Sequence, residues 1–497
     1  MKKRFLVIIV FQFLFFSFSF SQQEKIQKID TYIQSAMKEW KMPGFAVAIV
    51  KNDSIVFAKG YGVKDIRTNE PVNENTLFMI ASCTKAFTTA ALSILVDQGK
   101  IKWEDPVTKY LPNFQMYDPW VTKQMMIKDL VTHRSGLETF SGDILWLGST
   151  YDSKEVIRRS QFLKPTSSFR SKYGYQNIMF SVAGSIVPAV TDTTWGEYIN
   201  AHIFKPLGMD NSVTSISEMK ENGNFAFPHK ILKGNVIPYN DFWSIESVAP
   251  AGAINSSVAD MSQWLRLQLR KGKFNGKQIF SEQQSNEMWS NQMAIGNSNY
   301  GLGWFIRYWN GKKLLNHGGG MPGMISDVSI LPEENVGLVI LSNAESGMVT
   351  AIRNYVLEVL INKEPKDWSK IMLDGWQKRE ENFETENKRR EEVRVKDTKP
   401  SLPLEKFCGT YEDKMYGKAE VTLKDGELYL QFLPSPFLRG KLHHYHFDTF
   451  YIDWEDDFLT RGWVKFDMNF DAAIKKFTIE VPNSPDFIFT ELLFEKK

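Results

Sequence analysis

The spacing of apolar residues predicts a helix followed by two strands near the start of the chain. Between residues 25 and 40, apolar side chains recur every three or four positions, which is typical of a helix with one buried face. Pro43-Gly44 ends that pattern. Two apolar runs, residues 45–50 and 55–60, then flank a polar turn at residues 52–54. We therefore expect an amphipathic helix and an antiparallel strand pair.

Helical periodicity dominates from Ser82 to about residue 239, and a second β region begins near Tyr300. The elements expected there are strands over residues 304–309, 312–317, 327–331 and 336–341 and a helix over residues 349–361. Asn310-Gly311, between the first two strands, is the strongest short hairpin pattern. Strands at both ends of a helical segment predict an α/β fold: an antiparallel-sheet domain flanked by helices, with an inserted all-helical domain. The cleft between these two parts is the expected place for a site.

The C-terminal part of the chain changes character twice. Residues 366–403 are rich in charges of both signs and predict a solvated, helical linker. From residue 404 onward, short aromatic-rich strands return, among them residues 419–423 and 427–432. They predict a small all-β domain, a barrel or a sandwich, over residues 404–497. The first domain then spans residues 22–365.

The first 21 residues have the pattern of a signal peptide. Lys2, Lys3 and Arg4 precede an apolar run over residues 5–20, and small residues at −3 and −1 favour cleavage after Ser21. An uncleaved N-terminal anchor is the alternative, because the apolar run is slightly long. No later stretch is long and apolar enough to span a bilayer. We expect an exported protein, periplasmic or extracellular.

Charge and cysteine content limit the classes of partner. The formal net charge is +2, and it becomes −1 without the three basic residues of the signal peptide. A nearly neutral chain gives no reason to expect nucleic acid or an anionic membrane as a partner. Cys83 and Cys408 lie far apart, so the fold does not rely on disulfides. We interpret Cys83 as a small buried side chain.

Ser82 lies where an apolar extended run over residues 78–81 meets a helical pattern. That pattern continues to Gly99, which is typical of the position after a helix end. Lys85 follows one turn after Ser82 and on the same face. A hydroxyl beside an amine that can lose its proton is a nucleophile with its own base, and free N–H groups at a helix start can hold an oxyanion. Without further motifs, a helix-capping serine is the simpler interpretation.

Two further segments carry residue types suited to the same chemistry. In Tyr173-Gly174-Tyr175-Gln176-Asn177, a Tyr175 hydroxyl near an ammonium is expected to have a lowered pKa and to pass a proton, and Asn177 offers a donor and an acceptor to a substrate amide. In His317-Gly318-Gly319-Gly320, the glycines allow the backbone to approach a substrate closely.

Together these segments resemble the serine β-lactamase and penicillin-binding-protein-like hydrolases of the class C type, a group that includes D-aminopeptidases, D,D-peptidases and esterases. The catalytic motifs are Ser82-Cys83-Thr84-Lys85 (S-x-x-K), Tyr175-Gln176-Asn177 (Y-x-N) and His317-Gly318-Gly319 in place of K-T-G. The supporting stretches are residues 130–137, 205–209 and 250–253. All occur in the family's order between about residues 26 and 360, and the tail from residue 404 resembles an appended lipocalin-like β domain.

The resemblance implies a serine β-lactamase-like fold and an acyl-enzyme mechanism. Ser82 would attack a carbonyl, Lys85 and Tyr175 would handle its proton, and the N–H groups of Ser82 and Gly320 would hold the oxyanion. Asn177, His317, Gly319 and Gly320 would contact the substrate. The mechanism calls for neither a metal nor another cofactor. The expected partner is a small-molecule or peptide substrate, with cell-wall fragments as one source.

One residue departs from the family's pattern. His317 stands where dedicated β-lactamases carry a lysine, and a histidine is mostly neutral near pH 7, so it holds a substrate carboxylate weakly. This favours a peptidase or an esterase over an efficient β-lactamase. A receptor for penicillin or peptidoglycan fragments, acylated without turnover, is a rival of another class. The natural substrate, the role of the β domain and the oligomeric state are not encoded in any short motif.

Overall fold

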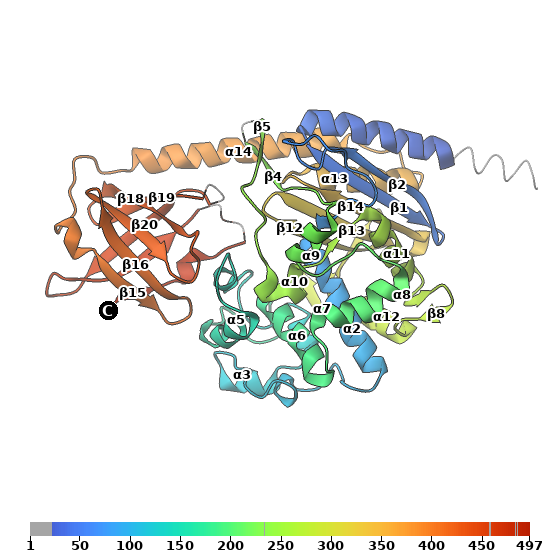
Figure 1. Ribbon diagram of the computed structural model, residues 1–497, viewed down its shortest axis with the longest axis horizontal. Coiled ribbons are helices and arrows are strands. Elements are labelled where there is room, and N and C mark those ends of the chain that lie inside the picture. Colours follow the sequence, from blue (N-terminus) through green and yellow to red (C-terminus); the bar gives the residue numbers. More distant parts are fainter. Residues whose placement is uncertain (1–21, 233, 457–458, 483, 485) are drawn as a thin grey trace, which may run out of the picture.

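The computed structural model describes residues 22–232, 234–456, 459–482, 484 and 486–497, and Figure 1 shows its arrangement. The predicted signal peptide and its cleavage site lie outside these residues. No helix among the described residues combines the length and the apolar character that a membrane crossing requires.

An antiparallel sheet of eight strands, in the order β2-β1-β14-β13-β12-β11-β10-β9, forms the centre of the first domain. The strands are β1 (Gly44–Lys51), β2 (Ser54–Gly62), β9 (Met293–Ile295), β10 (Ser298–Tyr300), β11 (Phe305–Trp309), β12 (Lys312–Met321), β13 (Met324–Leu331) and β14 (Val336–Ser342). The hairpin predicted at Asn310-Gly311 is confirmed, and both turn residues have positive φ (49° and 80°), as a tight hairpin of this kind requires.

Helices cover both faces of this sheet. A helix over residues 22–40 and α13 (Met348–Leu360) pack on one face, while α2 (Thr84–Asp97) and α11 (Val258–Leu269) pack on the other. Alternate side chains of β1 enter the two resulting cores, which is why this strand is apolar throughout instead of alternating.

The predicted helical region lies between the strands of the sheet in sequence and beside the sheet in space (Figure 1). Its helices are α3 (Pro119–Gln124), α4 (Ile127–Leu130), α5 (Ser153–Arg159), α6 (Asn177–Val190), α7 (Trp195–Ile199), α8 (Lys205–Leu207), α9 (Ile216–Asn222), α10 (Ala249–Gly252) and α12 (Glu282–Met288). Three short strand pairs accompany them: β3 (Phe78–Met79) with β6 (Asn255–Ser256), β4 (His229–Leu232) with β5 (Asn235–Pro238), and β7 (Lys273–Phe274) with β8 (Lys277–Gln278).

The charged stretch after the first domain forms a long helix, α14 (Trp368–Glu392), which leads to a closed barrel. The barrel strands are β15 (Gly409–Asp413), β16 (Gly417–Lys424), β17 (Glu427–Phe432), β18 (Arg439–His446), β19 (Thr449–Trp454), β20 (Gly462–Met468), β21 (Ile474–Glu480) and β22 (Phe494–Lys496). Buried and exposed residues alternate along β16, as expected for a strand with one face inside a barrel. The prediction of a small all-β domain is confirmed.

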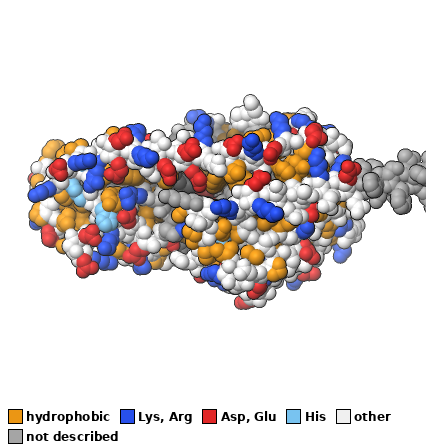
Figure 2. Space-filling view, turned by 90° about the horizontal axis from the view of Figure 1, so that it is seen from above, with side chains coloured by type: hydrophobic (Ala, Val, Ile, Leu, Met, Phe, Trp, Pro, Cys, Tyr) orange, Lys and Arg blue, Asp and Glu red, His pale blue; other side chains and the backbone are white. Residues whose placement is uncertain are grey.

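The barrel lies against the helical region, at residues 142–159. The Tyr151 hydroxyl donates to the Tyr416 carbonyl (2.8 Å), Arg159 donates to the Met415 carbonyl (2.7 Å), and the Ser435 hydroxyl donates to the Leu147 carbonyl (2.8 Å). Basic and acidic side chains are interspersed over the face seen in Figure 2, without a large area of one sign. This surface matches the nearly neutral composition.

Candidate active site

Ser82 lies in a 3₁₀ turn, Ala81–Cys83, that leads directly into α2. The prediction that Ser82 opens the α-helix is therefore wrong by one short turn, because the α-helix begins at Thr84. Ala81 has a φ of 45°, a left-handed conformation that is unfavourable for alanine. Such strain just before a candidate nucleophile is typical of functional sites. The helix end at Gly99 (φ 70°) agrees with the prediction.

The Lys85 side chain is fully buried and points at Ser82. Its Nζ atom lies 3.0 Å from Ser82 Oγ and donates to Asn177 Oδ1 (2.6 Å) and to the Ala251 carbonyl (2.9 Å). Burial lowers the pKa of Lys85 from 10.5 to about 7. Near neutral pH, a substantial fraction of this amine therefore carries a lone pair that can take the Ser82 proton.

Behind Lys85, Asn177 contacts a buried acid, Asp143, which the sequence analysis did not identify. Asn177 Nδ2 donates to Asp143 Oδ2 (2.6 Å), so the Asn177 side chain is engaged on both sides within the protein. Burial raises the pKa of Asp143 to about 8. In this structure Asn177 links Asp143 to Lys85, although we expected its amide to be free for a substrate. Asp143 opens a short 3₁₀ turn, Asp143–Leu145, 34 residues before Asn177, and belongs to no short motif.

Tyr175 lies beside both Ser82 and Lys85. The Lys85 ammonium is 4.8 Å from the centre of the Tyr175 ring. The prediction that the Tyr175 pKa is lowered is wrong here: burial raises it well above 10, and the hydrogen bond with Ser82 only opposes that shift. His133, whose ring centre is 4.2 Å from that of Tyr175, accepts a hydrogen bond at Nδ1 from the Gln176 N–H (3.0 Å). His133 therefore supports the segment that carries Tyr175.

His317 is buried and its two ring nitrogens are both occupied. Nδ1 lies 2.7 Å from the Gly318 carbonyl, which can only accept, so Nδ1 carries the proton. Nε2 then accepts from the Tyr300 hydroxyl at 2.9 Å. Burial lowers the pKa of His317 to about 3. A neutral His317 side chain near pH 7, as expected from the sequence, agrees with this lowered pKa and with its two hydrogen bonds.

Gly319 brings β12 into direct contact with the Ser82 turn. A Cβ atom at Gly319 would lie 2.2 Å from the Ile80 carbonyl oxygen and 2.9 Å from the Ser82 backbone nitrogen. Gly318 is different, because the nearest atom to its Cβ would be the Ser326 carbonyl oxygen at 3.6 Å, an ordinary contact. The close approach of β12 to the Ser82 turn therefore requires a glycine at position 319 but not at position 318.

We expect Gly319→Ala to reduce kcat/KM by about a hundredfold, because displacing Ser82 by an ångström has costs of that order. Gly318→Ala is the matched control and should retain activity within about twofold. Steady-state kinetics with a short-chain ester, together with thermal melting of both variants, measure the two effects. Equal activity of the two variants would contradict the role of this contact.

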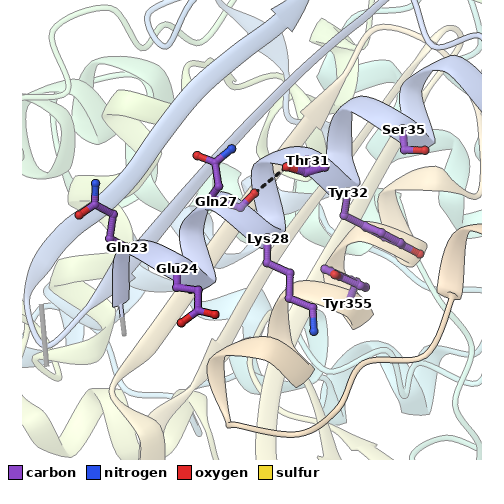
Figure 3. A pocket seen from close by; sticks show the side chains of 8 residues that line it. All are labelled: Gln23, Glu24, Gln27, Lys28, Thr31, Tyr32, Ser35 and Tyr355. Atoms are coloured by element: carbon purple, nitrogen blue, oxygen red, sulfur yellow. Dashed lines mark hydrogen bonds between the residues drawn. The ribbon is translucent and has the colours of Figure 1, made fainter. Parts of the chain in front are cut away.

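Ser82, Tyr175, Asn177 and His317 line one cleft of about 610 Å³, together with the glycines of β12. A second hollow, shown in Figure 3, lies along the helix over residues 22–40. Tyr32 and Tyr355 stack there at 3.5 Å, Lys28 pairs with Glu364, and the exposed Ser35 hydroxyl bonds Glu39. Within the described residues, no serine of this hollow bonds a lysine. The first cleft is the candidate active site.

The barrel contributes to this cleft. Asp486 lines it, and Phe487 packs edge-on against Trp146 of the helical region, with ring centres 5.4 Å apart. The sequence left open whether the β domain covers the site, and in the structure it forms part of its wall. No group of three or more His, Cys, Asp or Glu residues suited to a metal occurs in the described part of the chain.

The fold and this cleft together define a serine β-lactamase-like protein, and comparison with known families agrees. Residues 29–363 match the family model Beta-lactamase, so the chain belongs to that family. Residues 393–496 match a family described only as a domain of unknown function, DUF3471.

Individual relatives are distant. Unguisins hydrolase ungD' of Aspergillus campestris is 26% identical over 411 residues, covering 77% of this chain and 75% of the relative. Protein flp of Staphylococcus aureus (strain MW2) is 26% identical over 341 residues, covering 68% of this chain and 66% of the relative. The octameric penicillin-binding protein homologue from Pyrococcus abyssi has a TM-score of 0.63 at 23% identity, covering 95% of this chain and 100% of that one, which supports the fold.

Proposed function

We propose that the protein is a serine hydrolase that forms an acyl-enzyme on Ser82. The observation that carries this proposal is the buried Lys85 amine, 3.0 Å from Ser82 Oγ and with a pKa of about 7. Lys85 takes the hydroxyl proton as Ser82 attacks a carbonyl carbon. No other serine that lines the cleft bonds a lysine within the described residues.

Tyr175 and the backbone complete the proposed cycle. With its raised pKa, Tyr175 remains protonated and donates its proton to the leaving group as that group departs. The proton that Lys85 took from Ser82 then passes to the Tyr175 oxygen, which restores both side chains. The N–H groups of Ser82 and Gly320 hold the oxyanion, and the close packing of Gly319 on the Ser82 turn supports this placement. Water then attacks the acyl-enzyme and releases the acid, regenerating the Ser82 hydroxyl.

For the substrate we propose a small amide or ester, with a D-amino-acid peptide as the first candidate and cell-wall fragments as a source. The neutral His317 gives a β-lactam carboxylate no cation at that position, which favours a peptidase or an esterase over a β-lactamase. A hydrolase and a penicillin-binding protein homologue among the similar proteins fit this range. We also propose export, because residues 1–21 have the pattern of a signal peptide.

Intact mass spectrometry tests the proposal directly. The protein is mixed with a penicillin or with a short-chain ester, and its mass is followed over time. A lasting penicillin adduct on Ser82 with turnover of the ester indicates a peptidase or esterase that β-lactams inhibit. Rapid loss of the adduct with release of product indicates a β-lactamase instead. A lasting adduct without any turnover favours the receptor alternative.

A further inference from the structure

A chain of hydrogen bonds leads from Ser82 through buried side chains to Asp143. Lys85 Nζ lies 3.0 Å from Ser82 Oγ and 2.6 Å from Asn177 Oδ1, and Asn177 Nδ2 lies 2.6 Å from Asp143 Oδ2. Lys85 and Asp143 are fully buried, and Asn177 is nearly so. Asp143 does not line the cleft. It can therefore act on the reaction only through Asn177 and Lys85.

Asp143 determines which way the Asn177 amide faces. An ionised carboxylate can only accept hydrogen bonds, so Asn177 must turn its NH₂ group towards it. The Asn177 carbonyl oxygen then faces Lys85, as it does in the structure. The opposite orientation would place two oxygens against each other and the NH₂ group against the Lys85 amine. An ionised Asp143 excludes that orientation.

The fixed amide in turn directs the lone pair of Lys85. A neutral amine has two N–H groups to donate and one lone pair. Asn177 Oδ1 and the Ala251 carbonyl, 2.6 and 2.9 Å from Nζ, can only accept, so each takes one N–H. The remaining direction faces Ser82 Oγ at 3.0 Å. The Ser82 proton therefore meets the lone pair and not a competing N–H.

The turn that carries Asp143 is held from two sides. The Phe140 N–H donates to the Tyr175 carbonyl (2.8 Å), and the Asp143 N–H donates to the Phe140 carbonyl (3.1 Å). From the barrel domain, Glu491 accepts a hydrogen bond from the Gly142 N–H (2.9 Å). Asp143 is thus fixed relative to both the Tyr175 segment and the barrel domain.

We propose that Asp143 is a positioning residue for acylation: through Asn177 it holds the lone pair of the neutral Lys85 amine towards the Ser82 hydroxyl. This inference rests on the proposed function, in which Lys85 is the base. In that step the Ser82 O–H bond breaks and an N–H bond forms on Lys85. The Ser82 oxygen bonds the carbonyl carbon, whose π electron pair moves to the carbonyl oxygen. Asp143 neither gains nor loses a proton.

Asp143 also affects how much of Lys85 is in its basic form. Burial lowers the pKa of Lys85, and the charge of an ionised Asp143 opposes that shift. Removing this charge should lower the Lys85 pKa further and leave more free amine. The other titratable groups around Lys85, all unaltered by a substitution of Asp143, are Cys83, His133, Tyr175, His317 and Asp486.

Asp143→Asn separates the two effects, since asparagine has nearly the same shape but can turn either an NH₂ group or a carbonyl towards Asn177. We expect kcat/KM for 4-nitrophenyl acetate, on its plateau at about pH 9, to fall about ten- to a hundredfold, the range for a lost hydrogen bond to a charged group. The midpoint of the pH profile should move below 7, because the Lys85 pKa falls. A purely electrostatic role would move the midpoint and keep the plateau, and a purely structural role would keep the midpoint.

Asp260→Asn is the matched control. Asp260 is also a buried carboxyl whose pKa burial raises, and it accepts from the Ser212 hydroxyl (2.8 Å) away from the cleft. This variant should melt at a lower temperature and keep both plateau and midpoint. An unchanged plateau in Asp143→Asn, with Ser82→Ala inactive, overturns the role of Asp143 alone. Full hydrolysis by Ser82→Ala would overturn the proposed function as well.

NMR gives a second measurement, on the unaltered protein. With ¹⁵N-labelled asparagine, the Asn177 side-chain signal should move as Asp143 titrates near pH 8, because its NH₂ group donates to that carboxyl. The signal is identified by its absence from Asn177→Ser. A signal that stays constant through pH 8 would refute the proposal, even if Asp143→Asn failed to fold.

Discussion

The Ser82→Ala variant is expected to lose ester turnover by about 10⁴-fold or more, the loss seen when a serine nucleophile is removed. It should also gain no mass on incubation with a penicillin, because Ser82 is the only cleft-lining serine, among the described residues, that bonds a lysine. Its fold should persist: Ser82 is half-buried, and Lys85 keeps its bonds to Asn177 and to the Ala251 carbonyl. Initial rates and intact mass measure the two effects.

Ser93→Ala is the matched control for this variant. Ser93 lies on α2, the helix that follows the Ser82 turn. It is fully buried, and its Oγ atom has no hydrogen-bond partner among the described residues. Removing that hydroxyl leaves no partner unsatisfied, so activity and melting temperature should stay close to those of the original protein. Retention of more than about a hundredth of the activity by Ser82→Ala would contradict the role of Ser82.

Local patterns predicted the elements whose signals are local. Asn310-Gly311 specified its hairpin because both residues accept a positive φ, and the apolar spacing after Ser82 specified α2. The pairing of Ser82 with Lys85 followed from one helical turn. The 3₁₀ start of that segment did not, because the strained Ala81 is held by tertiary contacts.

The rest of the site depends on long-range packing. Asp143, Arg307 and Asp486 come from a 3₁₀ turn, a sheet strand and the barrel domain. Only the folded chain brings Arg307 and Asp486 to one cleft and Asp143 to the Asn177 side chain beneath it. The pKa of Tyr175 likewise depends on the folded structure. The sequence indicates a nearby ammonium, which lowers a phenol pKa, but it does not reveal the complete burial that outweighs this attraction.

Lys85→Met is expected to reduce kcat/KM by about 10³-fold, within the usual contribution of a general base. In the original protein, the base is active only when it is deprotonated. Since its folded pKa of about 7 lies below the ordinary 10.5, kcat/KM should rise with pH up to about 7 and then level off. Below that pH, Lys85 gains a proton and activity falls about tenfold per pH unit.

Lys313→Met controls for the loss of a partly buried lysine, because Lys313 of β12 donates to the Trp289 carbonyl (2.9 Å) and does not line the cleft. This variant should lose some stability and keep the pH profile.

Asp143, with a pKa of about 8, is linked to Lys85 through Asn177, so the inflection of the original protein belongs to the coupled pair. If Lys85 is the base, the inflection persists in Asp143→Asn with a shifted midpoint and disappears in Lys85→Met. An unchanged inflection in Lys85→Met would assign the titration, and the role of base, to another group.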